Sequence, residues 1–244
     1  MNSIFLSIVI PAYNEEVRLP NTLAQVMDFI QQQPFDSEVI VVENGSTDCT
    51  LKIAQEFAAR SSCFHVIHEG QRGKGLAVKR GMLQAQGEFC FMCDADLSMP
   101  VAKISAFLPP QLSDFDVAIA SREFPGAQRY NEPFYRHLGG RAINLLIRTL
   151  ALPGLQDTQC GFKCFRSDTA NDLFSSLTLS GWSFDVEVLY VARLRGYRIV
   201  ERPIPWYYNP QTKLSLFKDT LRMVMDIVKI RQNARQGEYT RRIN

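Results

Sequence analysis

Short apolar runs alternate with helical stretches through the first half of the chain, and this alternation limits the fold more than any other feature. The runs of strand type are residues 5–11, 38–43, 64–68, 88–93 and 116–120. Between the first two runs, apolar residues recur at helical spacing from Leu23 to Ile30. Continuous apolar strands that alternate with helices are typical of a mostly parallel sheet covered by helices on both faces. The sequence therefore predicts an α/β fold that binds ligands beyond the carboxyl ends of its strands.

The second half of the chain is less regular. It predicts a polar loop at 123–131, helices at 135–152, 183–195 and 214–232, and strands at 161–165 and 197–204. Pro203 and Pro205 should place the last strand at an edge of the sheet, because proline cannot donate to the ladder of hydrogen bonds. No linker or repeat interrupts the chain, so we expect a single domain over residues 1–244.

The charge of the chain is small but unevenly distributed. A formal net charge of +2 argues against a nucleic-acid binder. Residues 211–244 hold eight Lys and Arg against three acidic residues, which predicts an anionic partner for this end. No apolar run reaches the ~18 residues that span a bilayer, and residues 4–10 indicate a first strand and not a signal peptide.

The six cysteines predict reduced thiols in the cytoplasm, because no secretory signal accompanies them. Cys90 with Cys93, and Cys160 with Cys164, have spacings that could suggest zinc. In a strand, however, Cys90 and Cys93 point to opposite faces. Small buried side chains are the favoured interpretation.

Polar residues follow three of the predicted strands, at 11–16, 43–48 and 94–96. Turn and cap chemistry accounts for residues 44–48, but not for Asp94 and Asp96 directly after a buried strand. Two uncompensated carboxylates repel each other, so a divalent cation is their natural partner. Oxygen ligands on so short a motif predict Mg²⁺ or Mn²⁺ that shares its coordination shell with substrate phosphates.

A basic loop at 71–75 precedes the third helix, whose N-terminus favours an anion. Gly75 stands where a Walker A loop needs Ser or Thr, and no G-x-G-x-x-G follows the first strand. These features argue against a P-loop protein and a dinucleotide-dependent dehydrogenase. A nucleotidyltransferase would need a basic glycine-rich loop where the acidic residues Glu15 and Glu16 stand.

Four motifs resemble those of family-two glycosyltransferases with the GT-A fold: Pro11-Ala-Tyr-Asn-Glu-Glu, Val41-Val-Glu-Asn-Gly-Ser-Thr-Asp, Gly73-Lys-Gly and Asp94-Ala-Asp-Leu. Three more resemble the dolichyl-phosphate glucosyltransferase branch, which is closely related to the mannosyltransferases: Ser121-Arg-Glu, Asp157-Thr-Gln-Cys-Gly-Phe-Lys and Trp182-Ser-Phe-Asp-Val-Glu-Val-Leu. The resemblance implies an inverting enzyme that moves a hexose from a nucleotide sugar to a polyprenyl or dolichyl phosphate. Glucose from UDP-glucose is favoured. Mannosyl or N-acetylglucosaminyl transfer, and a non-catalytic scaffold subunit that binds nucleotide sugars, remain alternatives.

The resemblance also implies residue roles. Residues 1–121 would form the half that binds the nucleotide sugar, and residues 122–210 the acceptor half. The expected contacts of the nucleotide sugar are Pro11, Ala12, Tyr13, Glu15, Glu43, Lys74, Asp94, Ala95 and Lys213. Asp94 and Asp96 would hold the metal on the diphosphate, with Asp96 and Asp157 as catalytic carboxylates. Asn44 replaces an aspartate that is common in the family. Of Asp185 and Glu187, one is expected to orient sugar hydroxyls and the other to be solvated.

The acceptor phosphate is expected to contact Arg122, Arg129 and Arg136, because a guanidinium group can bind two phosphate oxygens at once through bidentate hydrogen bonds. A phosphate monoester, with its second pKa near ~6, is already largely ionised at neutral pH and needs no strong general base. The divalent cation would stabilise the charge of the leaving diphosphate.

The final helix combines a broad apolar surface with basic residues in residues 211–244. This pattern predicts a helix that lies on an anionic membrane surface. We therefore expect a peripheral protein at the cytoplasmic face of a membrane. The alternative is a helix that packs on the body of the protein or on a second subunit in a homodimer.

Overall fold

Seven strands form one sheet in this computed structural model, which describes residues 4–209 and 216–240, except the side chains of Tyr135, Arg136, Leu138, Ala142 and residues 216–220. The strands are β1 (Leu6–Ala12), β2 (Ser37–Glu43), β3 (Phe64–His68), β4 (Phe89–Cys93), β5 (Val117–Ser121), β7 (Phe162–Arg166) and β8 (Ile199–Pro203). Their order is β3-β2-β1-β4-β7-β5-β8. Only β7 runs antiparallel to its neighbours, so the carboxyl ends of the other six strands share one edge.

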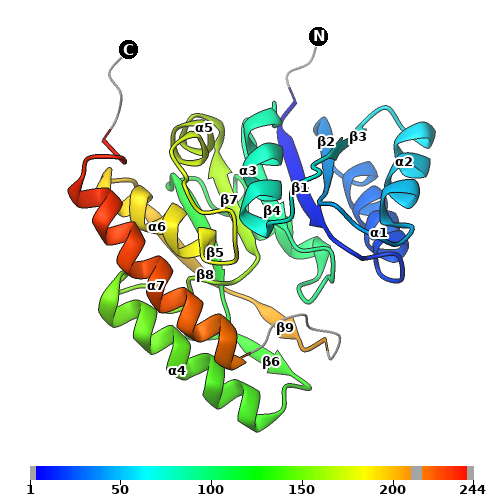
Figure 1. Cartoon of the computed structure of the whole chain (residues 1–244). Coiled ribbons are helices and arrows are strands. Elements are labelled where there is room, and N and C mark those ends of the chain that lie inside the picture. Colours follow the sequence, from blue (N-terminus) through cyan, green and yellow to red (C-terminus); the bar gives the residue numbers. More distant parts are fainter. Residues whose placement is uncertain (1–3, 210–215, 241–244) are drawn as a thin grey trace.

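Helices cover both faces of this sheet, as predicted (Figure 1). They are α1 (Leu19–Gln31), α2 (Thr50–Arg60), α3 (Lys74–Gln84), the 3-10 helix η1 (Val101–Phe107), α4 (Phe134–Leu150), α5 (Ser167–Ser175), α6 (Phe184–Leu194) and α7 (Leu216–Arg235). Because successive strand residues face opposite ways, β1 contributes Ile8 and Ile10 to the core under α1, and Val9 to the core under α3. Both faces are therefore apolar, which explains the continuous apolar runs.

Cys90 and Cys93 lie in the two different cores, as strand periodicity predicts. Burial raises the pKa of the Cys90 thiol to about 12, and Glu38 adds to this effect. All six cysteines are free thiols. Cys90 and Cys93 therefore act as small core residues, because each fills its own side of the sheet.

Some elements differ from the sequence prediction. The loop expected at 123–131 contains a short strand, β6 (Gln128–Tyr130), which pairs in parallel with β9 (Pro205–Tyr207). The strand expected at 197–204 ends at Pro203 as β8, an edge strand, and β9 begins two residues later. Helices η1 and α5 were not predicted. Three-residue strands have no readable periodicity, and α5 follows β7 with no intervening turn.

The final helix α7 packs against the body through one face and exposes the other. Met223, Ile227 and Ile230 are buried in the core, and Arg231 Nη1 donates to Leu150 O at 3.1 Å. Helices α4 and α7 lie side by side in Figure 1. The outer face of α7 carries Leu221, Met225 and Val228, which are 51–60% exposed. Among the helices of the described ranges, none is long and apolar enough to cross a membrane.

Candidate functional site

The polar residues that follow the predicted strands lie together at one edge of the sheet. Ala12, Glu43 and His68 are the last residues of β1, β2 and β3, and they pair with one another in a single row. Asn44 N donates to Ala12 O at 2.9 Å, which joins the first two tips. The carboxyl ends of β4 and β5 lie at the same edge, so Asp94 and Arg122 follow strands that end there. The antiparallel strand β7 begins at this edge and brings the preceding residues to it.

Asp94 and Asp96 form the charged centre of this edge. Lys74 Nζ lies 2.7 Å from Asp94 Oδ1, and Asp96 Oδ1 accepts a hydrogen bond from Ser98 N at 3.0 Å. Burial raises the pKa of Asp96, and the charge of Asp94 raises it further. Burial alone would lower the pKa of Lys74, but the charges of Asp94 and Asp185 outweigh it and raise that pKa. The site therefore combines two carboxylates that repel each other with one cation.

This arrangement suits a divalent cation that is shared with a diphosphate. The two carboxylates supply only oxygen ligands, as Mg²⁺ and Mn²⁺ prefer. Within the described ranges, no group of three or more metal-ligating side chains occurs. Substrate phosphates would therefore have to complete the coordination shell, which is the usual arrangement for Mg²⁺.

Gly161, which sequence reasoning missed, makes room for Asp94. Asp94 N donates to Gly161 O at 3.1 Å, and a Cβ atom added at Gly161 would lie 1.8 Å from Asp94 Oδ2. No side chain fits there without displacing the carboxylate. The glycine lies between Cys160 and Phe162, inside a motif that had been noted for its resemblance alone.

Asn44 holds the basic loop in place, and this explains why it is not an aspartate. Its amide Nδ2 donates to Gln71 O, and its Oδ1 accepts from Gly73 N at 2.7 Å. A carboxylate could make only the second of these bonds. Behind the loop, a Cβ atom at Gly75 would lie 2.8 Å from Leu179 O. The loop is therefore fixed from both sides, which positions Lys74 at the start of α3.

The other expected nucleotide contacts differ in how accessible they are. Ala12 and Ala95 are buried in the core, and Pro11 is half-buried. The guanidinium of Arg72 lies over the Tyr13 ring, and the distance from Arg72 Cζ to the ring centroid is 4.3 Å. Glu15 binds Arg18 through both carboxylate oxygens at 2.6 Å. Tyr13 is therefore stacked on a cation at this edge, and the Glu15 carboxylate is already neutralised by Arg18.

Asp157 and Arg122 form a buried ion pair with each other. Arg122 Nε and Nη2 donate to the two Asp157 oxygens at 2.7 and 2.9 Å, and Arg122 N donates at 2.9 Å. Burial alone would raise the pKa of Asp157, but Arg122 outweighs it and lowers that pKa to about 2. This carboxylate is ionised and fully hydrogen-bonded, so it can orient Arg122 but is poorly suited to accept a proton.

Arg129 lies beside this pair and is itself neutralised. It binds Glu123 at 2.5 Å and Glu132 at 2.7 Å. The Cζ atoms of Arg122 and Arg129 each lie 5.6 Å from the centroid of the Trp206 ring. The structure thus places the guanidinium groups of two of the three expected arginines beside the indole ring of Trp206.

Two expected contacts lie outside the described part of the chain. Arg136 belongs to α4, but its side chain is outside the described residues, and all of Lys213 is. Their roles stay predictions.

Asp185 lies in the charged centre, and Glu187 does not. Lys163, which is fully buried, donates from Nζ to Asp185 and to Cys160 O, the latter at 2.7 Å. Burial raises the pKa of Asp185, although Lys163 and Lys74 oppose this effect. The carboxylate of Glu187 accepts instead from Thr178 and Leu179 N and from the Tyr239 hydroxyl. The expectation that one of the two acidic residues is solvated was wrong, because both are buried.

A model of glycosyl transferase family 2 matches residues 7–174. The chain belongs to this family. Dolichyl-phosphate beta-glucosyltransferase of Dictyostelium discoideum is 33% identical over 245 residues, which are 95% of this chain and 75% of that protein. The Homo sapiens protein of the same name is 33% identical over 258 residues, or 98% and 80% of the two chains.

The fold of this family-2 glycosyltransferase is of the GT-A type. Glucosyl-3-phosphoglycerate synthase from Mycobacterium tuberculosis, in complex with Mn²⁺ and UDP-glucose, superposes with a TM-score of 0.65 at 18% identity, covering 92% of this chain and 78% of that one. Mannosyl-3-phosphoglycerate synthase from Rubrobacter xylanophilus gives a TM-score of 0.67 at 17% identity, covering 99% and 77%. The predicted family and fold are confirmed.

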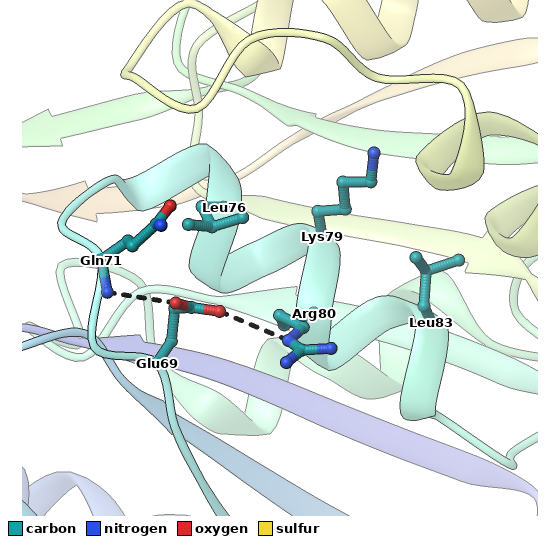
Figure 2. A pocket seen from close by; sticks show the side chains of 6 residues that line it. All are labelled: Glu69, Gln71, Leu76, Lys79, Arg80 and Leu83. Carbon is teal, nitrogen blue, oxygen red and sulfur yellow. Dashed lines mark hydrogen bonds and ion pairs between the residues drawn. The ribbon is translucent and has the colours of Figure 1, made fainter.

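A surface hollow of about 420 Å³ lies between α3 and the loop that follows β3 (Figure 2). Glu69 accepts from Gln71 N at 3.1 Å and lies 3.3 Å from Arg80 Nε. The hollow is lined by Glu69, Gln71, Leu76, Lys79, Arg80 and Leu83. Neither Asp94 nor Asp96 lines it, so the two carboxylates of the charged centre lie outside this hollow.

Proposed function

We propose that this glycosyltransferase moves glucose from UDP-glucose to dolichyl phosphate or another polyprenyl phosphate. The observation that carries the proposal is the position of Asp94 and Asp96 at a strand tip, with Lys74 Nζ 2.7 Å from Asp94 Oδ1. The names of the relatives support both glucose and the lipid phosphate. Neither of these two relatives is named for mannosyl or N-acetylglucosaminyl transfer or as a scaffold subunit.

The donor would lie across the row of strand tips. Its base would stack beside Tyr13, and its diphosphate would lie between Asp94 and the N-terminus of α3, which favours negative charge. Asp94 and Asp96 would hold Mg²⁺ or Mn²⁺, which supplies Lewis-acid stabilisation of the leaving diphosphate. Lys74 would add a second positive charge beside the same phosphates.

The acceptor phosphate would approach from the side of Arg122 and Arg129. Asp157 fixes the Arg122 guanidinium through Nε and Nη2, which leaves Nη1 as the donor that the phosphate can reach. The phosphate is already ionised, so its oxygen can attack C1 in line without a base. Attack from the face opposite the leaving group would invert the α-linkage of the donor to a β-linkage.

The outer face of α7 provides a surface for the membrane in which such a lipid resides. The exposed residues Leu221, Met225 and Val228 are flanked by Arg222 and Lys229 on one side, and by Arg231 and Arg235 on the other. An apolar row between basic rows is typical of a helix that lies at the headgroup boundary of anionic lipid. The free thiols favour the cytoplasmic face of that membrane.

A thermal-shift panel tests the donor assignment. UDP-glucose, GDP-mannose and UDP-N-acetylglucosamine are each added with Mn²⁺, at concentrations about a hundredfold above the expected dissociation constant. Binding should raise the unfolding temperature by roughly 5–10 °C for UDP-glucose, and less for the other two. EDTA should remove most of this shift. A larger shift with GDP-mannose would contradict the proposal.

A further inference from the structure

His68 forms a contact with Glu43 that sequence reasoning did not anticipate. His68 Nδ1 lies 2.5 Å from Glu43 Oε2, and Ser46 N donates to the other carboxylate oxygen. The Glu43 side chain is 1% exposed, whereas that of His68 is 58% exposed. The residue expected to contact the nucleotide is therefore buried behind a histidine that solvent can reach.

The contact with Glu43 decides which nitrogen of the ring carries the proton. An ionised carboxylate can only accept, so Nδ1 must be the donor. In the neutral ring, Nε2 then keeps its lone pair and is a hydrogen-bond acceptor. This tautomer follows from the hydrogen-bond network.

Among residues 4–209 and 216–240, no hydrogen bond or ion pair reaches His68 Nε2. Gly70 follows β3, and a Cβ atom added there would lie 4.0 Å from Nε2. Gly45, with a φ of +66°, follows β2, and its added Cβ would lie 3.2 Å from Gly70 O. Because both loops carry glycine at this point, they pack closely, and Gly70 itself places no side chain beside Nε2. The Tyr13 ring, stacked on Arg72, follows β1 at the same edge.

We propose that His68 reads the base of the nucleotide sugar by accepting a hydrogen bond at Nε2 from the ring N–H of uracil, while Glu43 fixes the imidazole. This inference rests on the proposed donor site at the strand tips. It predicts a preference for bases whose ring nitrogen carries hydrogen next to a carbonyl group. Cytosine has a bare ring nitrogen at this position, so its lone pair would face that of Nε2.

Calorimetric titration with UDP and CDP in the presence of Mn²⁺ tests this role. The wild-type chain should bind UDP more tightly than CDP. In His68→Asn, the amide nitrogen can replace Nδ1 beside Glu43, but nothing replaces Nε2. The variant should bind UDP about 3- to 10-fold more weakly, as expected for one lost hydrogen bond, with CDP binding unchanged. His68→Gln places an amide near the Nε2 position and should retain more of the preference.

His65 provides a matched control. It lies on the same strand, its Nε2 is 3.6 Å from Glu38 Oε2, and it pairs with Ile40 in the middle of β2, away from the strand tips. His65→Asn should bind UDP and CDP as the wild type does. If UDP binds the wild type and the two Asn variants equally, His68 does not read the base, although the donor site stands. If the wild type binds neither UDP nor UDP-glucose, the donor site itself is wrong, and this inference fails with it.

Discussion

At the scale of single residues, Asn44 is informative because its amide both donates and accepts a hydrogen bond, whereas an ionised carboxylate can only accept. Asn44→Asp would keep the bond from Gly73 N and lose the donor to Gln71 O. We expect the free energy of unfolding to fall by about 0.5–1.5 kcal/mol, because the part-buried hydrogen bond to the Gln71 carbonyl is lost. The KM for the nucleotide sugar should rise, since Lys74 follows directly after this loop.

Urea unfolding and donor titration measure the two effects of Asn44→Asp. The matched control is Asn171→Asp on the exposed side of α5, which makes the same chemical change without touching the loop. Equal stability and equal KM in the two variants would show that the loop does not depend on the amide.

The buried pair of Asp157 and Arg122 predicts a specific dependence of stability on pH. The pKa of Asp157 is about 2 in the folded state, below its ordinary value of 3.8. An acid whose folded-state pKa is depressed stabilises the protein above its unfolded pKa, and this stabilisation is lost as pH falls from about 4 towards 2. The difference corresponds to about 2 kcal/mol.

Asp157→Asn should remove this part of the pH dependence. Its free energy of unfolding, measured in urea between pH 5 and pH 3, should fall less steeply than that of the wild type. Asp114→Asn, which changes an exposed partner of Arg198, is the control and should follow the wild type. Parallel slopes for wild type and Asp157→Asn would mean that the pair does not shift the titration.

At the scale of elements, the antiparallel strand β7 shapes the proposed metal site through Gly161, the residue that precedes the strand. Gly161→Ala would place a methyl group 1.8 Å from Asp94 Oδ2 and move the carboxylate. We expect Mn²⁺-dependent binding of UDP to weaken at least 10-fold, because Asp94 is one of the two proposed protein ligands of the metal. Calorimetry with UDP and Mn²⁺ measures this loss.

Gly140→Ala in α4 is the control for this substitution, because nothing lies within 4 Å of an added Cβ there. It should leave UDP binding unchanged, and it should raise the free energy of unfolding by up to about 1 kcal/mol, since alanine is the better helix former. If Gly161→Ala binds UDP with Mn²⁺ as tightly as the wild type does, Asp94 is not a ligand of the metal.

The exposed outer face of α7 is the surface that we propose binds the membrane. Replacing Leu221, Met225 and Val228 together by Ser should weaken flotation with anionic liposomes roughly 10-fold or more, because three exposed apolar side chains no longer enter the headgroup region. Val17→Ser, at another exposed apolar site, should float as the wild type does. If the wild type does not float at low salt and sediments as a dimer, the outer face of α7 is a subunit interface.

At the scale of the whole molecule, the sequence predicted the features that depend on local pattern. Strand β3 was predicted over its full length, and the tips of β1, β2 and β4 meet as expected because parallel strands end at one edge. The ion pair of Asp157 with Arg122 joins residues 35 positions apart, and no local sequence pattern indicates it. The same is true of Lys163 with Asp185, which depends on how α6 packs near β7, and of Glu43 with His68, which depends on sheet register.

The central claim is that Asp94 and Asp96 support metal-dependent transfer of glucose from UDP-glucose to a lipid phosphate. The most direct measurement follows radiolabelled glucose from UDP-glucose into organic-extractable lipid, with dolichyl phosphate and Mn²⁺, in wild type and in Asp96→Asn. We predict labelled lipid from the wild type, at least a 100-fold lower rate with Asp96→Asn, as when one group that stabilises the transition state is lost, and none in EDTA. Full transfer in EDTA, or transfer from GDP-mannose but not from UDP-glucose, would contradict the claim.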